Sequence, residues 1–224
     1  MSTDPIDDIR LLVQGQWSAL TSRMGLTDHD GLLWQTINKA YGEQHRHYHA
    51  LSHVAHLIAD FERVCGGFDD PDTALLALIF HDIVYDPARR DNEEKSGDLL
   101  CERLSGEISE SRLERACRHI VSTRTHVATD DADTNLVLDL DMAILGAAWP
   151  DYLGYARGVW REYQPVYGEE AYRTGRIGLF LEPTLGRERI FLTDVFSKFE
   201  ASARENLRRE LTAWQTGGAE VLLD

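Results

Sequence analysis

A histidine and an aspartate stand side by side where an apolar segment of this chain ends. Ala74 to Phe80 are followed directly by His81 and Asp82, and then by a charged loop that contains proline. A buried polar group without a partner is unfavourable by about 1–3 kcal/mol, so two such groups need a ligand. A divalent metal ion would satisfy both, and a capped helix end is the alternative.

A second His-Asp pair shows that the dipeptide alone does not define a site. His29 and Asp30 lie in TDHDG at an expected helix start, where Asp or Thr caps the backbone and no other ligand is near in sequence. We interpret this pair as structural. The assignment of His81 and Asp82 therefore depends on the residues around them.

Further histidines precede the central segment. His49, His53 and His56 are spaced i, i+4 and i+7, so on one helix all three would project from the same face. Helical histidines at this spacing can hold a divalent ion, and a solvated polar face is the alternative. His45 and His47 come before the apolar stripe and are expected on the surface.

Two aspartates interrupt the later apolar segment LVLDLDMAILG. Asp139 and Asp141 point to different sides of a helix, so at most one of them can join a given metal ion. We select Asp141 because it shares the inward face, whose other members are Val137, Leu138, Ile144 and Leu145. The alternative is a buried ion pair between Asp141 and an arginine.

The elements that would position these residues are helices. Helical periodicity is nearly continuous and strand signals are scarce, which predicts an all-α fold. Gly66-Gly67 end the histidine helix and Asp70-Pro71 begin the central one. We expect one domain over residues 1–215, made of a metal-binding core at about 41–146 with C-terminal helices 150–215 packed on it, and a tail at 216–224.

Composition limits the possible partners. The formal charge of −15 over 224 residues disfavours binding to a nucleic-acid polymer or to an anionic membrane surface. No apolar run approaches the roughly 18 residues of a membrane span, and the acidic N-terminus lacks the features of a signal peptide. Three cysteines without CxxC spacing argue against a disulfide framework. A cytoplasmic location is expected.

The order of these motifs resembles the H…HD…D ligand set of the HD superfamily of metal-dependent phosphohydrolases. The chain is similar to the subfamily of predicted metal-dependent HD-superfamily phosphohydrolases over roughly residues 34–211. This similarity is carried by YHALSHV, LIFHDIVYD, DNEEKS, TRTH at 123–126, LDLDMAILG, WREY and ARENL. The resemblance implies an HD-domain-like helical bundle around a metal site, with additional N- and C-terminal helices. Its metal ligands would be His53, His81, Asp82 and Asp141.

The donor set agrees with this resemblance. Two imidazoles and two carboxylates suit Mn²⁺, Fe²⁺, Co²⁺, Ni²⁺ or Zn²⁺, with Mg²⁺ as a further candidate for this divalent cofactor. Such an ion activates water and polarises a phosphoryl oxygen, which hydrolysis of a phosphoester requires. The expected substrate is a small phosphorylated metabolite or nucleotide.

Candidate catalytic residues accompany Asp82. Glu93 or Glu94 resembles the acidic position that some HD enzymes use for proton transfer, although the spacing here is longer. The alternative is an acidic first turn that complements the helix dipole. His126 could be an outer-shell residue, a ligand of a second metal or a phosphate contact, or simply a polar residue at a helix end.

Substrate binding is assigned to His49, Arg161 and Arg176. The two arginines lie amid apolar helical sequence, where a guanidinium needs an anionic partner. That partner could be a substrate phosphate, held through two parallel hydrogen bonds. The alternative partners are glutamates inside the core, namely Glu162, Glu182 and Glu200.

Two other functions remain open from the sequence. A di-iron oxygenase of the HD type would need additional ligands, for which His49, His56 and His126 are the candidates. A non-catalytic sensor would use the metal structurally or bind a nucleotide without turnover.

Overall fold

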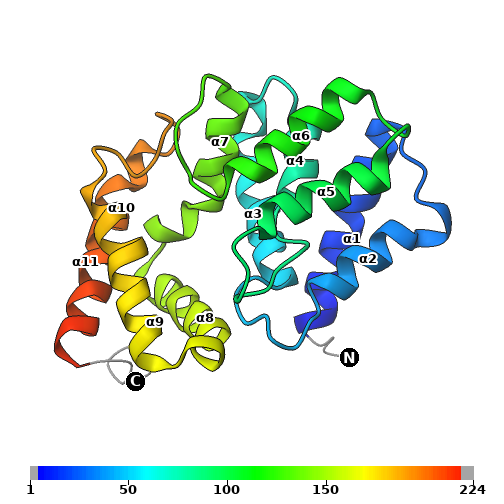
Figure 1. Ribbon diagram of the computed structural model, residues 1–224. Coiled ribbons are helices and arrows are strands. Elements are labelled where there is room, and N and C mark those ends of the chain that lie inside the picture. The colour runs from blue at the N-terminus through cyan, green and yellow to red at the C-terminus, as the bar shows by residue number, and fades with distance from the viewer. Residues whose placement is uncertain (1–4, 218–224) are drawn as a thin grey trace. The chain divides into compact units, whose positions relative to one another are not determined.

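The computed structural model describes residues 5–217 (Figure 1). This part of the chain consists of helices and turns and contains no β-strand, which confirms the all-α prediction. None of its helices has the length and apolar character needed to cross a bilayer. Most of the predicted tail, residues 218–224, lies outside the described residues, and the last helix continues to Thr216.

The chain divides into two compact units, with the boundary between Asp141 and Met142. The first unit holds all the residues expected to bind metal. Its helices are α1 (Pro5–Met24), α2 (Leu32–Ala40), α3 (Leu51–Val64), α4 (Pro71–Phe80), α5 (Asn92–Leu104), α6 (Glu110–Ser122) and α7 (Ala132–Asp141). Short 3₁₀ turns follow α1 and α3, at His29–Gly31 and Cys65–Gly67.

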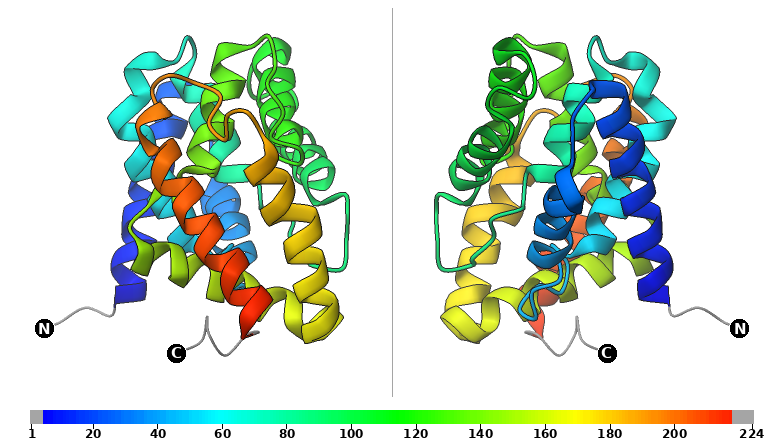
Figure 2. Two further views of the ribbon diagram at one scale, coloured as in Figure 1. Left: turned by 90° about the vertical axis from the view of Figure 1, so that its left-hand side faces the viewer. Right: turned by 90° about the vertical axis from the view of Figure 1, so that its right-hand side faces the viewer.

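Helix α4 is the centre of the first unit. The Asp70 side chain accepts a hydrogen bond from the backbone N–H of Thr73, and Pro71 occupies the first turn, so the helix begins where the sequence predicts. Every residue from Thr73 to Phe80 is buried. Since α4 is apolar on all sides, it must be covered all round, and it contacts α1, α3, α5, α6 and α7. Helices α5 and α6 lie side by side in Figures 1 and 2.

Helix α3 begins later than the histidine spacing suggests. Ala50 has an extended backbone conformation, and the helix starts at Leu51. His49 therefore lies in the turn before the helix, and His56 is exposed while His53 is buried. The expectation that all three histidines share one helical face is wrong, and only His53 faces the core.

The second unit contains the C-terminal helices. They are α8 (Trp149–Tyr167), α9 (Glu169–Gly175), a π-helical segment η4 (Arg176–Leu181), α10 (Glu182–Gly186) and α11 (Glu200–Thr216), with 3₁₀ turns at Ala143–Gly146 and Ser197–Phe199. Gly168, with φ of 79°, separates α8 from α9. Helix α11 contacts η4 and α10, and Figure 1 shows it next to α10.

A buried ion pair forms the polar centre of this second unit. Arg176 donates from Nε and Nη2 to the two carboxylate oxygens of Glu210, at 2.8 and 3.0 Å. Tyr152 and Trp214 also donate to this carboxylate. Burial opposes the charge on Arg176, but the Glu210 carboxylate outweighs it and raises the pKa of the guanidinium. Arg176 thus pairs with a glutamate inside the core and not with a substrate phosphate. The glutamate is Glu210, which is not among the candidates Glu162, Glu182 and Glu200 expected from the sequence.

Arg161 differs from Arg176. It is exposed on α8, so the alternative in which Arg161 pairs with a glutamate inside the core is wrong. Glu162, the next residue, is buried instead. The apolar residues around Arg161 in the sequence therefore line the other side of the helix.

Replacing Arg176 by lysine should destabilise the second unit. Lysine keeps the charge but cannot donate two parallel hydrogen bonds to Glu210, so we expect the free energy of unfolding to fall by about 1–3 kcal/mol. Urea and thermal unfolding would measure this change. The exposed Arg208, which lies on α11 two residues before Glu210, provides the control, because Arg208→Lys should change stability by less than about 0.5 kcal/mol. Equal stability of the two variants would contradict the prediction.

Candidate metal centre

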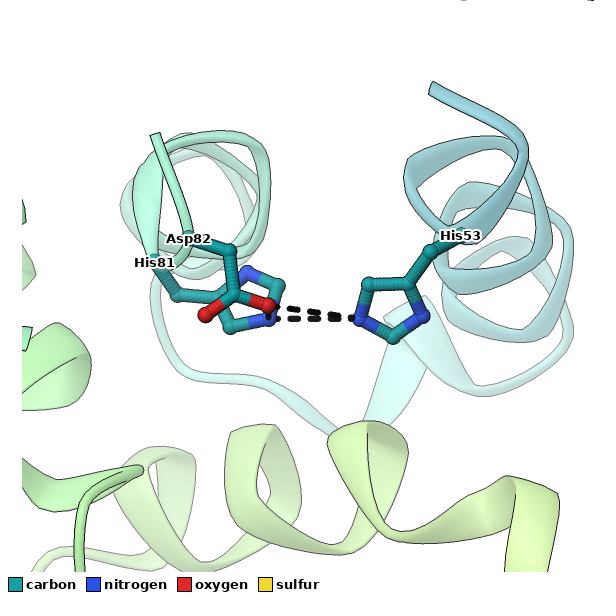
Figure 3. A group of neighbouring side chains, drawn as sticks. All are labelled: His53, His81 and Asp82. Atoms are coloured by element: carbon teal, nitrogen blue, oxygen red, sulfur yellow. Dashed lines mark hydrogen bonds and ion pairs between the residues drawn. The ribbon is translucent and has the colours of Figure 1, made fainter. Parts of the chain in front are cut away.

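Three side chains meet between α3 and the end of α4. His53, His81 and Asp82 point toward one another (Figure 3). The Nε2 atoms of the two histidines are 3.3 Å apart, and Asp82 Oδ2 lies 2.9 Å from His81 Nε2 and 3.9 Å from His53 Nε2. Within the described part of the chain, these residues form a group that could hold a metal ion.

Asp141, the last residue of α7, adds a second carboxylate to this group. Its Oδ1 atom lies 3.5 Å from Nε2 of His53 and 3.4 Å from Nε2 of His81. The structure thus brings together all four residues expected to bind metal, from α3, the turn that follows α4, and α7. Asp139 is buried elsewhere on α7, with 1% of its surface exposed.

The other oxygen of Asp141 is held by His126. Nε2 of His126 lies 2.9 Å from Asp141 Oδ2, and because an ionised carboxylate only accepts, the histidine donates. His126 has a positive φ of 48°, which is uncommon for a residue other than glycine. The contact leaves Oδ1 of Asp141 directed at the two histidines. Among the roles expected for His126, this geometry fits an outer-shell residue that orients Asp141.

The donor set fits a divalent ion. Metal–ligand bonds of about 2.0–2.2 Å place neighbouring ligand atoms roughly 3.0–3.5 Å apart. The separations within the cluster range from 2.9 to 3.9 Å. Nδ1 of His81 lies 2.9 Å from the carbonyl oxygen of Leu78, to which it donates. A histidine that donates from one ring nitrogen presents the lone pair of the other, here Nε2, to a metal.

The electrostatics of the cluster keep both carboxylates ionised. Burial opposes ionisation of Asp141, but His81 and hydrogen bonds from the histidines outweigh burial and hold the pKa of Asp141 well below its usual value. The pKa of Asp82 is lowered as well, against burial, by His81 and His49. Burial lowers the pKa of His53, which favours the neutral imidazole that a metal requires. By contrast, Asp82 and Asp141 outweigh burial at His81 and raise its pKa, so positive charge is stabilised at the centre of the cluster.

The two glutamates of the first turn of α5 differ in their contacts. Glu94 forms an ion pair with Arg124, which follows α6. Burial of the Glu93 carboxyl raises its pKa, and the negative charges of Asp82 and Glu94 act in the same direction. Glu93 is therefore the better candidate for proton transfer, whereas Glu94 connects α5 to α6.

The remaining histidines lie at different distances from the cluster. His49 stacks on Tyr85, with ring centroids 4.4 Å apart, and its ring is 5.9 Å from that of His53. It therefore lies beside the cluster, where substrate binding remains a prediction. His29 and Asp30 are both exposed, and the carboxylate of Asp28 accepts hydrogen bonds from the backbone at the start of α2. This arrangement agrees with a structural reading of the first His-Asp pair.

One residue against the cluster was missed from the sequence. Arg46 is buried and donates to the carbonyl oxygens of His49, Asp82 and Ile83. From the sequence only His45 and His47 of this segment are expected on the surface, where both lie, and Arg46 receives no role. The available signal was an arginine close to three histidines and only seven residues before His53.

Comparisons with known proteins do not assign the chain to a family. No family model matches it, and neither the curated proteins nor the solved structures contain a match. Functional inference therefore depends on the geometry described above.

Replacing Asp82 by alanine should abolish metal retention. The variant loses a carboxylate that lies 2.9 Å from His81 Nε2, whereas α4 ends at Phe80 and should keep its helical structure. Metal content by plasma emission spectrometry and helix content by circular dichroism measure the two effects. His29→Ala and Asp30→Ala serve as controls that should leave metal content unchanged. Full occupancy in Asp82→Ala would remove the proposed centre.

Replacing each aspartate of α7 by asparagine tests which of the two binds the metal. The carboxylate of Asp141 faces both histidines, and an amide in its place carries no net charge. Asp141→Asn should therefore weaken metal binding by about 10-fold or more. Asp139→Asn should have a smaller effect. Competition with a chromophoric chelator gives both dissociation constants. A larger loss for Asp139→Asn would transfer the ligand assignment to Asp139.

Proposed function

We propose that this protein is a metal-dependent phosphohydrolase of the HD superfamily, acting on a phosphoester of a small metabolite or nucleotide. The observation that carries the proposal is the convergence of two Nε2 atoms and two carboxylate oxygens, in the chain order His53, His81-Asp82 and Asp141. The same residues carry the resemblance to the H…HD…D ligand set of that superfamily.

Each residue of the cluster has a distinct task in this proposal. A divalent ion held here would supply Lewis acidity, lowering the pKa of water and polarising a phosphoryl oxygen. His53 and His81 offer Nε2, while Asp82 and Asp141 supply the two negative charges that select a cation. His126 keeps the Asp141 carboxylate in one orientation through its hydrogen bond.

Glu93 is the proposed proton carrier. A general acid or base works best when its pKa lies near the working pH, and partial burial raises the pKa of Glu93 from its ordinary value. Glu94 is held by Arg124, so it has a different role, fixing the first turn of α5. The Glu93 carboxyl is proposed to give a proton to the leaving oxygen of the substrate.

A small substrate suits the charge of the molecule. The net charge of −15 repels a polyanion, whereas the attraction of a single phosphoryl group to a divalent ion is local. Arg176 is engaged by Glu210 and is therefore not proposed as a phosphate contact. Arg161 lies in the second unit and is exposed, so its assignment to substrate binding stays a prediction from the sequence.

Metal analysis followed by a substrate panel tests the proposal. Protein purified without added metal should contain about one divalent ion per chain, and it should hydrolyse at least one member of a broad panel of phosphoesters. Chelation should abolish turnover, and added Mn²⁺ or Co²⁺ should restore it. Two irons with the absorbance of an oxo-bridged pair would favour an oxygenase instead. Tight nucleotide binding without turnover would favour a sensor.

The role of Glu93 predicts a specific change in the pH profile. As a general acid, Glu93 is active when protonated, so activity should fall as the pH rises through its raised pKa. Glu93→Gln should lower kcat by about 10²–10⁴-fold and remove this alkaline limb while metal content is unchanged.

The exposed Glu102, on the same helix, provides the matched control, and Glu102→Gln should keep both kcat and the limb. A Glu93→Gln enzyme that loses activity but keeps the wild-type pH profile would exclude Glu93 as the acid.

A further inference from the structure

Arg46 carries a buried positive charge in the first unit. Its side chain is 0% exposed, and its guanidinium lies over the rings of Tyr41 and Tyr85, 5.1 and 5.3 Å from the centroids. Removing an ion from water costs several kcal/mol, and a well-packed apolar residue often gives equal or greater stability. Stability alone is therefore a weak reason for a charged residue at this position.

The hydrogen bonds of Arg46 converge on the backbone of the candidate metal centre. Nη1 donates to the carbonyl oxygen of Asp82 at 2.6 Å, and Nη2 donates to that of Ile83 at 3.1 Å. Both carbonyls lie just beyond the end of α4, where no helical partner is available to them. Arg46 thus fixes the backbone of Asp82, from which one of the proposed ligands extends.

The same guanidinium also holds the segment that leads into α3. Nη1 donates to the carbonyl oxygen of His49 at 3.2 Å, two residues before α3 begins. Nε donates to Glu43 at 2.9 Å, which supplies the compensating charge. A single planar group therefore links the segment entering the helix of His53 to the backbone of Asp82.

We infer that Arg46 is a positioning residue for the metal centre, setting the separation between His53 and the His81-Asp82 pair. The inference rests on the proposed function, because it requires an ion at the cluster. Metal ligands need placement within about 0.5 Å, so loosening the Asp82 backbone should weaken metal binding. Lysine at this position offers one ammonium and cannot span three carbonyls in the guanidinium plane.

Two variants test Arg46 through metal affinity. In Arg46→Lys the charge remains, but the planar guanidinium that donates to several carbonyl oxygens is lost. In Arg46→Met the buried charge is removed while the side chain stays similar in length. Both should raise the metal dissociation constant by about 10–100-fold, as measured by chelator competition. Thermal melting of the metal-free proteins measures the effect of each variant on stability separately.

Arg112 provides the matched control. It also makes two hydrogen bonds, at 2.9 and 3.1 Å, but to Asp70 at the opposite end of α4. Arg112→Lys should lower the melting temperature of the metal-free protein and leave the metal dissociation constant within about twofold of wild type. A merely structural Arg46 would behave like Arg112.

Each outcome has a defined meaning. If wild-type protein binds no divalent ion, the proposed function fails and the role of Arg46 fails with it. If wild-type binds an ion and both Arg46 variants bind it equally well, only the inference is overturned. If neither Arg46 variant folds while Arg112→Lys does, Arg46 stabilises the unit as a whole, and a positioning role is likewise rejected.

Discussion

The first unit depends on the attraction between two partly buried carboxylates and positive charge at one point. Asp82 and Asp141 both have lowered pKa values although burial acts against their ionisation. Two anions in a low-dielectric region repel each other strongly unless a cation lies between them. Helix α3, the turn after α4, and α7 each bring a member of this cluster. A change in how these segments pack would therefore also change the electrostatics of the cluster.

The two units contain buried charges of different kinds. Arg176 and Glu210 form a closed pair, since Tyr152 and Trp214 complete the hydrogen bonding of the carboxylate and leave the pair without need of a ligand. The cluster of the first unit is open, because its two imidazole Nε2 atoms face each other at 3.3 Å and two such acceptors attract only when a proton or a cation lies between them. This difference distinguishes a structural polar core from a candidate site.

The sequence was most informative where local rules act alone. The cap of Asp70 and the apolar run after Pro71 were sufficient for α4. The inward face used to choose Asp141 over Asp139 does not exist as expected, because α7 ends at Asp141 and Asp139 is the more buried of the two. The start of α3 was misplaced, because Ala50 carries no capping side chain and only its extended backbone ends the turn. The partner of Arg176, Glu210, lies 34 residues away in the sequence. Tertiary packing determines which glutamate reaches Arg176, and helical periodicity carries no information about that packing.

The left-handed backbone of His126 has a consequence for how the protein would change under selection. Such a conformation costs a residue with a side chain of order 1 kcal/mol, and glycine adopts it freely. A screen for heat resistance alone would therefore favour glycine or asparagine at position 126 and gain stability there. The same exchange would remove the ring that orients Asp141. Histidine at this position thus sacrifices some backbone stability for a pre-organised carboxylate.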